Sequence, residues 1–539
     1  MVFTLQRYVF RELFKIFILA TIALTLILSL GGILRPVQEY GVGIRQVFHI
    51  LLYFMPVTLT FVLPMAALFA SALTYGRFAS DNELDACRAS GIGMSTLVYP
   101  GLTLAILVAI ANLLLSFHVM PYFVRLAERS LKADAKQILF RNIQRHGYYS
   151  LPPEERYLIY ADYADVRTDT LYGIVVIESS PQGLRRIITC ESARVSFDPH
   201  DWFNEVRLTT RNTRQLGGLD DVWFEIEAAS FRQQFGSLLG DDIKFKKIEE
   251  MKQIRVNPML FEPVAKIAHE AYIQLAAELL AQDIRTRLSA SPSEFYQLGG
   301  KLQTVRFLTK DCALENEPAI SLRPPSVVEE YARQGGRPPQ KFRCNKAVLY
   351  LDDSSPTAAS TGSAEPRLHM QLSNAEVLET GQSVIHHAIS GLAMPEVVVH
   401  ALRSKPTLQL VMPGNMPSVL AGPPSPKLAG LQRELDRELR GTLVDIKGEI
   451  NSRLVFGIGC IPMILIGIGL GIIKRGGHLL SAFGASCVPG AVLIVAIISG
   501  KQVAGNIRWD PTPGILIMWS GLAFLLVLTA IIYGRLLRR

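Results

Sequence analysis

Charged residues and cysteines are both scarce in this chain. Asp, Glu, Lys and Arg together make up 19% of its 539 residues, and only six cysteines occur. Six cysteines over such a length are too few for a disulfide framework, and none of them shows the spacing of a metal site. We interpret them as small buried apolar side chains and expect neither a metal nor another cofactor.

Nucleotide-binding and catalytic motifs are also missing from the sequence. No G-x-x-x-x-G-K-[S/T] loop occurs, so the chain has no P-loop for ATP, and the H-E-x-x-H and G-x-S-x-G patterns are absent. Because no convergent set of catalytic groups is visible, we do not expect an enzyme. The nearest P-loop lookalike lies in an apolar run, where Gly467 and Gly471 form a G-x-x-x-G face typical of close helix packing.

Long apolar runs are abundant and lie at the two ends of the chain. A run of about 20 apolar residues matches the roughly 30 Å hydrocarbon core of a bilayer. Six such runs cover about 13–34, 50–75, 97–118, 454–473, 480–499 and 513–533. The first run lacks a clean small-residue cleavage site and is followed at once by a second, so we interpret it as a retained span rather than a signal peptide.

The short loops between these runs carry the Lys and Arg residues that indicate orientation, because positive loops tend to remain cytoplasmic. These residues are Arg7, Arg11, Lys15, Arg77, Arg88, Lys474, Arg475, Arg535, Arg538 and Arg539. Their positions predict that both termini are cytoplasmic and that the polar middle of the chain lies outside the inner membrane. The net charge of +8 then reflects topology, and no nucleic-acid partner is expected.

The polar middle begins with strand-like sequence from about 148 to 235, where β-branched and aromatic residues alternate with polar ones. Residues 258–290 switch to helical spacing, and the Pro/Gly/Ser-rich stretches at about 318–340 and 353–366 are typical of linkers. Strands are expected again in KAVLYLDD, RLHMQLSNAEVLE and TLQLVMP. The pattern predicts an all-β sandwich interrupted by helix and linker, followed by a charged helix over 427–453 that leads into the fourth span.

A short charged stretch, SDNELDACRASGIG at residues 80–93, separates the second and third spans. Ser80 and Glu83 have the spacing of a capping box, and Gly91 is suited to the C-terminal stop of a short helix. Acidic residues near the start and Arg88 near the end suit the helix dipole. Two interpretations stay open here: Glu83 only caps a turn between two spans, or the stiff helix docks into a soluble partner.

Several separate motifs occur in a fixed order along the two membrane halves. They are RYVFRE, LSLGGILRPVQEYG, LPMAALFASALTYGRFASDNEL, CRASGI, EINSR, KRGGHLLSAFG and WDPTPGIL. Together they resemble the lipopolysaccharide-export permeases of the LptF/LptG family, also called YjgP/YjgQ, which are half-transporters of an ABC exporter. The resemblance covers about 1–135 and 445–537 and does not separate LptF-like from LptG-like members.

The resemblance implies an α-helical membrane protein with six transmembrane helices, three plus three, around a large periplasmic β-jellyroll-like domain. Residues 1–125 would hold transmembrane helices one to three with a cytoplasmic coupling helix at 80–91. Residues 126–445 would form the periplasmic domain, and 446–539 would hold helices four to six. A helical and Pro-rich insertion at about 255–345 makes this domain longer than is usual in the family.

The function implied by the resemblance is extraction of lipopolysaccharide from the inner membrane and its passage to a periplasmic bridge toward the outer membrane. A cytoplasmic ABC ATPase dimer would hydrolyse ATP, beside a second LptF/LptG-type subunit and periplasmic LptC/LptA-like jellyroll proteins. Two alternatives remain at this point. The chain is a permease for another lipid or a lipoprotein, or it is a membrane-anchored scaffold or enzyme that transports nothing.

Site residues also follow from the resemblance. Glu83, with Ser80 and Arg88 beside it, would couple the permease to the ATPase, while Arg35 at the outer end of the first span would contact lipid. On one interpretation, Arg35 is an interfacial anchor whose long side chain extends to the headgroups. Lipopolysaccharide, however, brings phosphates to this depth, and a guanidinium can pair bidentately with phosphate oxygens. No catalytic residue is expected.

Overall fold

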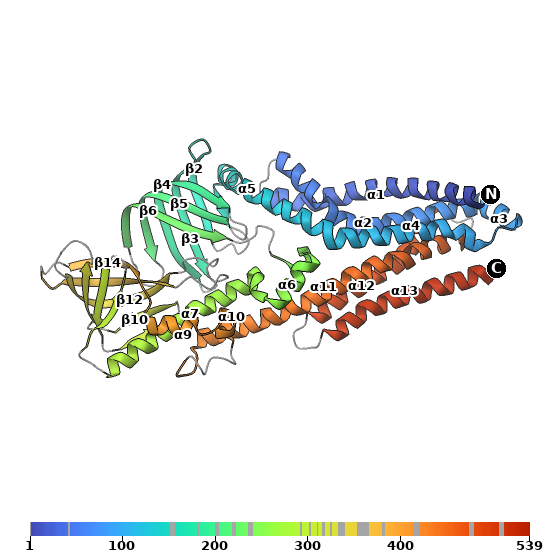
Figure 1. Ribbon diagram of the computed structural model, residues 1–539. Helices are drawn as coiled ribbons and strands as arrows, with labels where there is room; N and C mark the ends of the chain where they lie inside the picture. Colours follow the sequence, from blue (N-terminus) through green and yellow to red (C-terminus); the bar gives the residue numbers. More distant parts are fainter. Residues whose placement is uncertain are drawn as a thin grey trace. The chain divides into compact units, whose positions relative to one another are not determined.

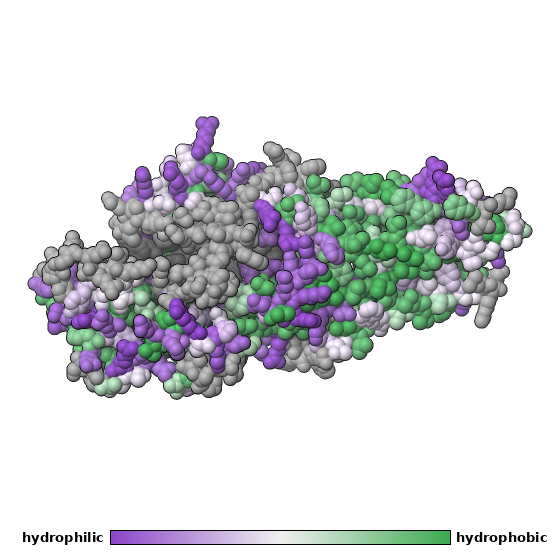
Figure 2. Space-filling model, viewed as in Figure 1, coloured by the Kyte–Doolittle hydropathy of each residue, from purple (hydrophilic) through white to green (hydrophobic). Residues whose placement is uncertain are grey.

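The computed structural model of the chain contains, among its described residues, six helices long and apolar enough to cross a membrane. Three precede and three follow the β-rich part, which confirms the expected fold class. The structure describes residues 2–538 except 41–43, 151–156, 181–182, 200–203, 218–222, 236–240, 291–293, 301–302, 310, 315–317, 324–325, 333–339, 353–365, 380–382, 413–419, 474–478 and 506–510. Figure 2 shows the broad apolar surface that these helices present on one face.

The chain divides into two compact units, which are described separately. The first unit comprises Met1–Lys252 and Thr442–Arg539, and the second comprises Gln253–Gly441. The domain boundaries expected from the sequence, near residues 125 and 445, stay predictions.

The membrane helices of the first unit run in long, nearly uninterrupted segments (Figure 1). In chain order they are α1 (Val2–Tyr40), α2 (Ile44–Ser80), α4 (Met94–Leu114), α5 (Met120–His146), α11 (Pro426–Ile473), α12 (Leu479–Ala504) and α13 (Thr512–Arg538). A π-helical turn, η1 (Leu115–Val119), joins α4 to α5, so that span three continues from Met94 to Ser130. The charged helix expected over 427–453 does lead directly into span four, as part of α11.

Helices α2 and α11 pack closely because glycines line the contact. A Cβ atom added to Gly467 would lie 2.6 Å from the Ser71 hydroxyl, and one added to Gly471 would lie 2.8 Å from the Ala72 carbonyl oxygen. The hydroxyl of Tyr75, a fully buried residue, donates to the Leu97 carbonyl of α4 at 2.9 Å. The G-x-x-x-G face predicted from the sequence is therefore a packing face between spans two and four.

The first sheet is an antiparallel meander in which each strand pairs with the next along the chain. Its strands are β1 (Tyr148–Ser150), β2 (Tyr157–Asp165), β3 (Thr170–Ser180), β4 (Gly183–Pro199), β5 (Asn204–Gly217) and β6 (Trp223–Phe235). Ile159 and Ala161 are buried while Tyr160 and Asp162, which alternate with them, are exposed. This is the period-two alternation of a sheet with one covered face. The sheet curls like part of a barrel (Figure 1).

Helix α5 covers part of the apolar face of this sheet. Its Leu139, Phe140 and Ile143 form one buried cluster with sheet residues that include Ile174 and Val195. The side chain of Gln144 adds a hydrogen bond of 3.0 Å to the Ala164 carbonyl. Because α5 continues from span three, the helix that leaves the membrane segment is itself packed against the sheet.

The second unit combines helices with a second antiparallel sheet. Its helices are α7 (Glu262–Ala290), α9 (Glu396–Arg403), α10 (Thr407–Val411) and the first turns of α11, while α6 (Ile248–Val256) crosses the unit boundary. Its strands are β7 (Tyr296–Gly299), β8 (Gln303–Leu308), β9 (Cys312–Leu314), β10 (Ala319–Leu322), β11 (Ser326–Ala332), β12 (Gln340–Asp352), β13 (Arg367–Val377) and β14 (Ser383–Leu392).

The main path of the second sheet runs β14-β13-β12-β11-β8-β7, with β10 and β9 branching from β12. An isolated bridge joins Gly300, just after β7, to Leu392 at the end of β14. The amide of Ala393 also donates to the Gly299 carbonyl at 2.7 Å. The two ends of the path therefore meet, and the buried rings of Phe307 and Phe342 belong to the interior core.

Helix α11 starts in the second unit, and a side chain caps its N-terminus. The Ser425 hydroxyl accepts from the Leu428 amide at 3.2 Å, and Pro426 follows at the first helical position, where its missing N–H costs nothing. The same hydroxyl donates to the carboxylate of Glu278, a residue 5% exposed on α7. The start of α11 is thus fixed to α7.

Two expectations about the middle of the chain are wrong. The stretch 318–340 is not a linker throughout, because β10 and β11 occupy 319–322 and 326–332. Its prolines lie around short strands, and apolar residues of these strands, such as Ile320 and Val328, are buried. TLQLVMP is not a strand, because α10 covers 407–411 and buries Leu410 and Val411. A short apolar run does not distinguish strand from helix, and Pro406 at the N-cap starts the helix here.

Candidate functional site

The short helix α3 (Glu83–Ala89) lies at the same end of the membrane helices as both chain termini (Figure 1). Leu84 is buried, at 3% exposed, and packs in the core formed by α1, α2, α4 and α11. Glu83 and Arg88 are exposed, as is Ser80. The helix is therefore anchored by Leu84, with Cys87 partly buried against the same core, and its exposed face carries Glu83 and Arg88.

The predicted capping box is wrong. Ser80 is the last residue of α2, and the N-cap of α3 is Asn82, which has a left-handed backbone (φ 56°) and makes no side-chain capping bond. The Arg77 carbonyl accepts from the Asp81 amide at 2.8 Å, so α2 extends through the residue expected to start a new helix. The sequence pattern missed this because a capping box presupposes a break before Ser80.

The predicted stop at Gly91 is confirmed. Gly91 has a left-handed backbone (φ 80°), its amide donates to the Arg88 carbonyl at 2.9 Å, and the Ile92 amide donates to the Cys87 carbonyl at 3.1 Å. These two bonds are the Schellman pattern, which glycine favours at this position. The C-terminal end of α3 is therefore rigid.

Glu83, the first residue of α3, has no hydrogen-bond or ion-pair partner among the described residues. A carboxylate at this position is stabilised by the helix dipole, which favours negative charge in the first turn. The arrangement offers an exposed, oriented acceptor on a short stiff helix.

The other predicted site residue, Arg35, lies near the C-terminal end of α1, and its side chain is outside the described part of the structure. Arg125 of α5 forms an ion pair of 2.6 Å with Glu250 of α6.

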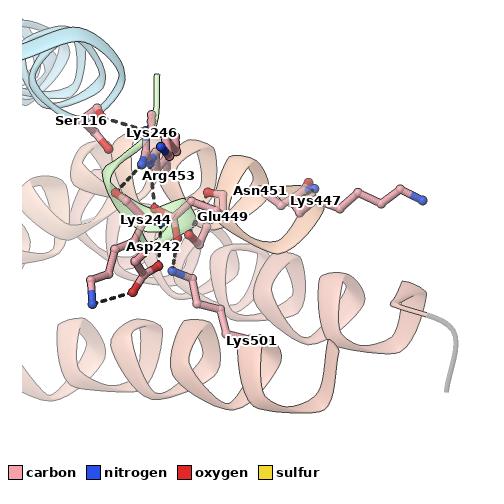
Figure 3. Close-up of polar contacts among 10 residues, drawn as sticks. Ser116, Asp242, Lys244, Lys246, Lys447, Glu449, Asn451, Arg453 and Lys501 are labelled. Carbon is pink, nitrogen blue, oxygen red and sulfur yellow. Dashed lines mark hydrogen bonds and ion pairs between the residues drawn. The ribbon is translucent and has the colours of Figure 1, made fainter. Parts of the chain in front are cut away.

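A buried arginine at the opposite end of the spans was not predicted as a site residue. Arg453 of α11 has a side chain that is 4% exposed. Its guanidinium donates to three backbone carbonyls: Ser116 at 3.0 Å, Lys246 at 3.3 Å and Lys244 at 2.7 Å. Figure 3 shows these carbonyls converging on the guanidinium from separate segments.

Glu449 completes this group, one helical turn before Arg453. Its carboxylate accepts from Arg453 at 2.8 Å and from Lys501 of α12 at 2.5 Å (Figure 3). We name the group Ser116, Lys244, Lys246, Glu449, Arg453 and Lys501 the Arg453 cluster. Breaking a buried ion pair by removing one partner typically costs about 3–5 kcal/mol, because the other charge stays buried without compensation.

The segment that follows the first sheet, residues 241–250, is held by the Arg453 cluster and by further charges, and we name it the return segment. Lys246 pairs with Asp241 at 2.5 Å, and the Lys247 amide donates to the Glu250 carboxylate at 3.1 Å. Glu250 also binds Arg125, as above. The return segment is thus tied to α11 on one side and to α5 on the other.

A cleft of about 220 Å³ opens beside the cluster, lined among others by Asp242, Lys244, Asp445, Glu449 and Lys501. Lys244 pairs with Asp242 at 2.8 Å, and Lys501 with Glu449. The charges of these two lysines and of their two acidic partners therefore compensate one another. Within the described residues, His, Cys, Asp and Glu side chains form no group that could hold a metal ion.

Comparison with known protein families identifies the first half of the chain. Residues 7–250, slightly less than half of the sequence, match the family model described as lipopolysaccharide export system permease LptF/LptG. Over this region the chain belongs to the LptF/LptG family. A search of curated proteins finds no match to the chain.

The permease is therefore a multi-pass membrane protein of the lipopolysaccharide export system. Permeases of this family are transmembrane subunits, and ATP is hydrolysed by the partner LptB. The matched region spans α1 to α5, the first sheet and the return segment, and it ends two residues before the unit boundary at Lys252. The second sheet lies beyond it.

One sequence pattern could have predicted part of the Arg453 cluster. Glu449 and Arg453 are four residues apart immediately before an apolar run, the spacing of an ion pair on one helix face. In EINSR this pair was a family motif without an assigned role. Its carbonyl partners are backbone atoms, which no sequence pattern reveals.

Proposed function

We propose that the permease extracts lipopolysaccharide from the outer leaflet of the inner membrane, passes it to the first sheet and on to a periplasmic bridge. It does so beside a second LptF/LptG-type subunit and above a dimeric cytoplasmic ATPase. The observation that carries this proposal is the arrangement of one unit. An exposed carboxylate on α3, with no partner among the described residues, lies at one end of the spans, and a curled sheet with an apolar face follows the other end. Such a layout suits energy input at one end and lipid delivery at the other.

The orientation in the membrane belongs to this proposal. The termini and α3 share one end of the spans, and the short loops there carry the Lys and Arg residues that favour the cytoplasmic side (Figure 1). We expect reporter fusions at Gly217 in β5 and at Gly476 between spans four and five to report opposite sides of the inner membrane. Equal signals from an alkaline phosphatase or fluorescent reporter at both positions would contradict the six-span topology.

Glu83 is proposed to couple the permease to its ATPase, together with Ser80 and Arg88, which are also exposed. Because α3 has no capping box in the structure, capping does not explain a glutamate at this position. An exposed carboxylate at the start of a rigid helix is suited to charge-assisted hydrogen bonds with a partner protein. The corresponding experiment opens the Discussion.

The periplasmic partners are proposed to bind the first sheet by strand pairing. Among the described strands, β1 and β6 lie at the two edges of this sheet. An edge strand presents unpaired backbone groups on which a strand of another protein can add. An LptC/LptA-like jellyroll strand is the proposed addition.

Arg35 is proposed to bind a phosphate of the lipid. It lies in the last turns of α1, after the part of span one that the structure places between Phe3 and Ser29. A guanidinium pairs with two phosphate oxygens at once, whereas an interfacial anchor needs only a positive charge near the headgroups.

We expect Arg35→Glu to leave membrane levels and ATPase association unchanged, and to lower lipopolysaccharide photocrosslinking and export. Charge reversal replaces an attraction to phosphate by a repulsion. Arg35→Lys is the matched control, because it retains an anchor but not the bidentate fork. Unchanged crosslinking in Arg35→Glu would return Arg35 to the role of an anchor.

A further inference from the structure

The Arg453 cluster connects four separate segments of the first unit around one guanidinium. These are the π-helical turn η1 in span three, the return segment after the first sheet, α11 of span four and α12 of span five. Three of the acceptors on Arg453 are backbone carbonyls, whose positions are fixed by the main chain and do not adjust by side-chain rotation. An arginine presents five N–H donors in a rigid planar fork, so it fixes the relative position of the segments it binds.

One of the Arg453 hydrogen bonds is made to the π-helical turn at Leu115–Val119. In a π-turn the hydrogen bonds shift from i→i+4 to i→i+5, and such turns occur frequently at functional sites in α-helices. Arg453 donates to the Ser116 carbonyl inside this turn, and its guanidinium carbon lies 5.6 Å from the centre of the Phe117 ring. Arg453 thus binds span three at its irregular turn.

A shift of register at η1 would rotate everything that follows it on the same helix. One residue corresponds to about 100° in an α-helix, because 3.6 residues complete a turn. The next helix is α5, and its Leu139, Phe140 and Ile143 pack against the first sheet. Arg453 therefore contacts both chain connections to that sheet: span three, which enters it through α5, and the return segment, which leaves it.

We propose that Arg453 is a positioning residue that couples the membrane spans to the first sheet, by holding η1 and the return segment in one arrangement relative to α11. Glu449 extends the coupling to span five, because its carboxylate binds Arg453 and Lys501 at once. Movement of spans four and five is then transmitted through Arg453 to both ends of the sheet. This inference rests on the proposed function, in which lipid passes from the spans to the sheet.

The test compares lipid contact at two positions in the assembled exporter. A photoreactive amino acid at Leu28, which is 52% exposed on α1, reports lipopolysaccharide at the spans. A second at Val176 of β3, which packs on the apolar cluster of the first sheet, reports lipopolysaccharide at the sheet. ATP hydrolysis is measured in the same preparations.

The variants are Arg453→Met and Arg453→Lys, and the control is Arg440→Met. Arg440 is also on α11 and also pairs with an acidic residue four positions earlier, Asp436, at 3.0 Å. Its side chain is 65% exposed, against 4% for Arg453, and its pair is exposed at both partners. The control therefore removes an ion pair of the same spacing on the same helix, but an exposed one that contacts no separate segment among the described residues.

In both Arg453 variants we expect near-normal ATP hydrolysis and near-normal crosslinking at Leu28. Crosslinking at Val176 should be lowered roughly tenfold in Arg453→Met, a typical size of coupling between distant sites. Arg453→Lys should lose less than Arg453→Met, because an ammonium retains charge but not the fork. Arg440→Met should match the wild type at both positions.

Parallel loss of crosslinking at both positions, or no loss at either, would overturn the inference. Failure of even Arg453→Lys to accumulate in the membrane would also overturn it, since Arg453 would then be a folding determinant. Failure of the proposed function itself looks different: the unsubstituted permease would crosslink lipopolysaccharide at neither position.

Discussion

Glu83→Gln is expected to lower ATPase association and ATP-driven export by roughly ten- to hundredfold, while the permease remains inserted in the membrane. Hydrogen bonds to charged groups contribute about 1.5–3 kcal/mol, and each 1.4 kcal/mol is about a tenfold change in affinity. Gln retains the size of Glu and one acceptor oxygen, but it loses the charge and carries a donor NH2 group in place of the second oxygen. Glu83 is exposed and makes no capping bond that the substitution would break. Co-purification of the ATPase and its stimulated hydrolysis rate are the measurements.

The matched control for Glu83 is Asp81→Asn. Asp81 is also exposed and acidic, two residues earlier, but it precedes α3 rather than starting it. We expect this variant to bind the ATPase as the unsubstituted permease does. If Glu83→Gln also binds normally, the charge of Glu83 is not what the ATPase recognises, and the coupling proposal fails.

Gly471→Ala is expected to destabilise the packing of span four on span two. The new Cβ would lie 2.8 Å from the Ala72 carbonyl oxygen and 3.1 Å from the Gly76 amide nitrogen, both of which are backbone atoms of α2. Backbone atoms cannot turn aside, so the two helices must separate. Overpacking of this kind typically costs about 1–3 kcal/mol. Thermal unfolding of the purified permease in detergent measures the loss as a lower Tm.

Gly534→Ala provides the control for this substitution. Gly534 lies in α13, another membrane helix, and a Cβ built there meets no atom within 4 Å among the described residues. Alanine also favours helix more than glycine does, by about 1 kcal/mol, so this variant should be neutral or slightly stabilised. Equal Tm values for the two alanine variants would show that the close approach at Gly471 contributes nothing.

The membrane helices were predictable from the sequence because the bilayer imposes length and apolar composition on each span. The first-sheet strands were also predictable, since residues such as Ile159 and Ala161 alternate with exposed neighbours. α10 was not, because five residues are too few to show a period, and its burial against other elements decides the outcome. Tertiary contacts override local preference in such short segments.

The candidate site was likewise predictable from the sequence only in part. The Schellman stop at Gly91 depends on local backbone geometry and followed from one glycine. The start of α3 did not follow, because α2 continues through Ser80 for reasons of packing rather than of local sequence. Arg453 was invisible as a site residue, since its partners at Ser116 and Lys244 are main-chain atoms hundreds of positions away.

The bridge between Gly300 and Leu392 bears on how one chain can carry two antiparallel sheets without mixing them. Strand exchange is a characteristic misfolding route when similar elements share a polypeptide, and unpaired edges are where it begins. In the second sheet the two terminal strands of the main path are joined to each other at this point. Because the bridge pairs the end of β7 with the end of β14, these two edges offer fewer free backbone groups to another strand, including a strand of the first sheet.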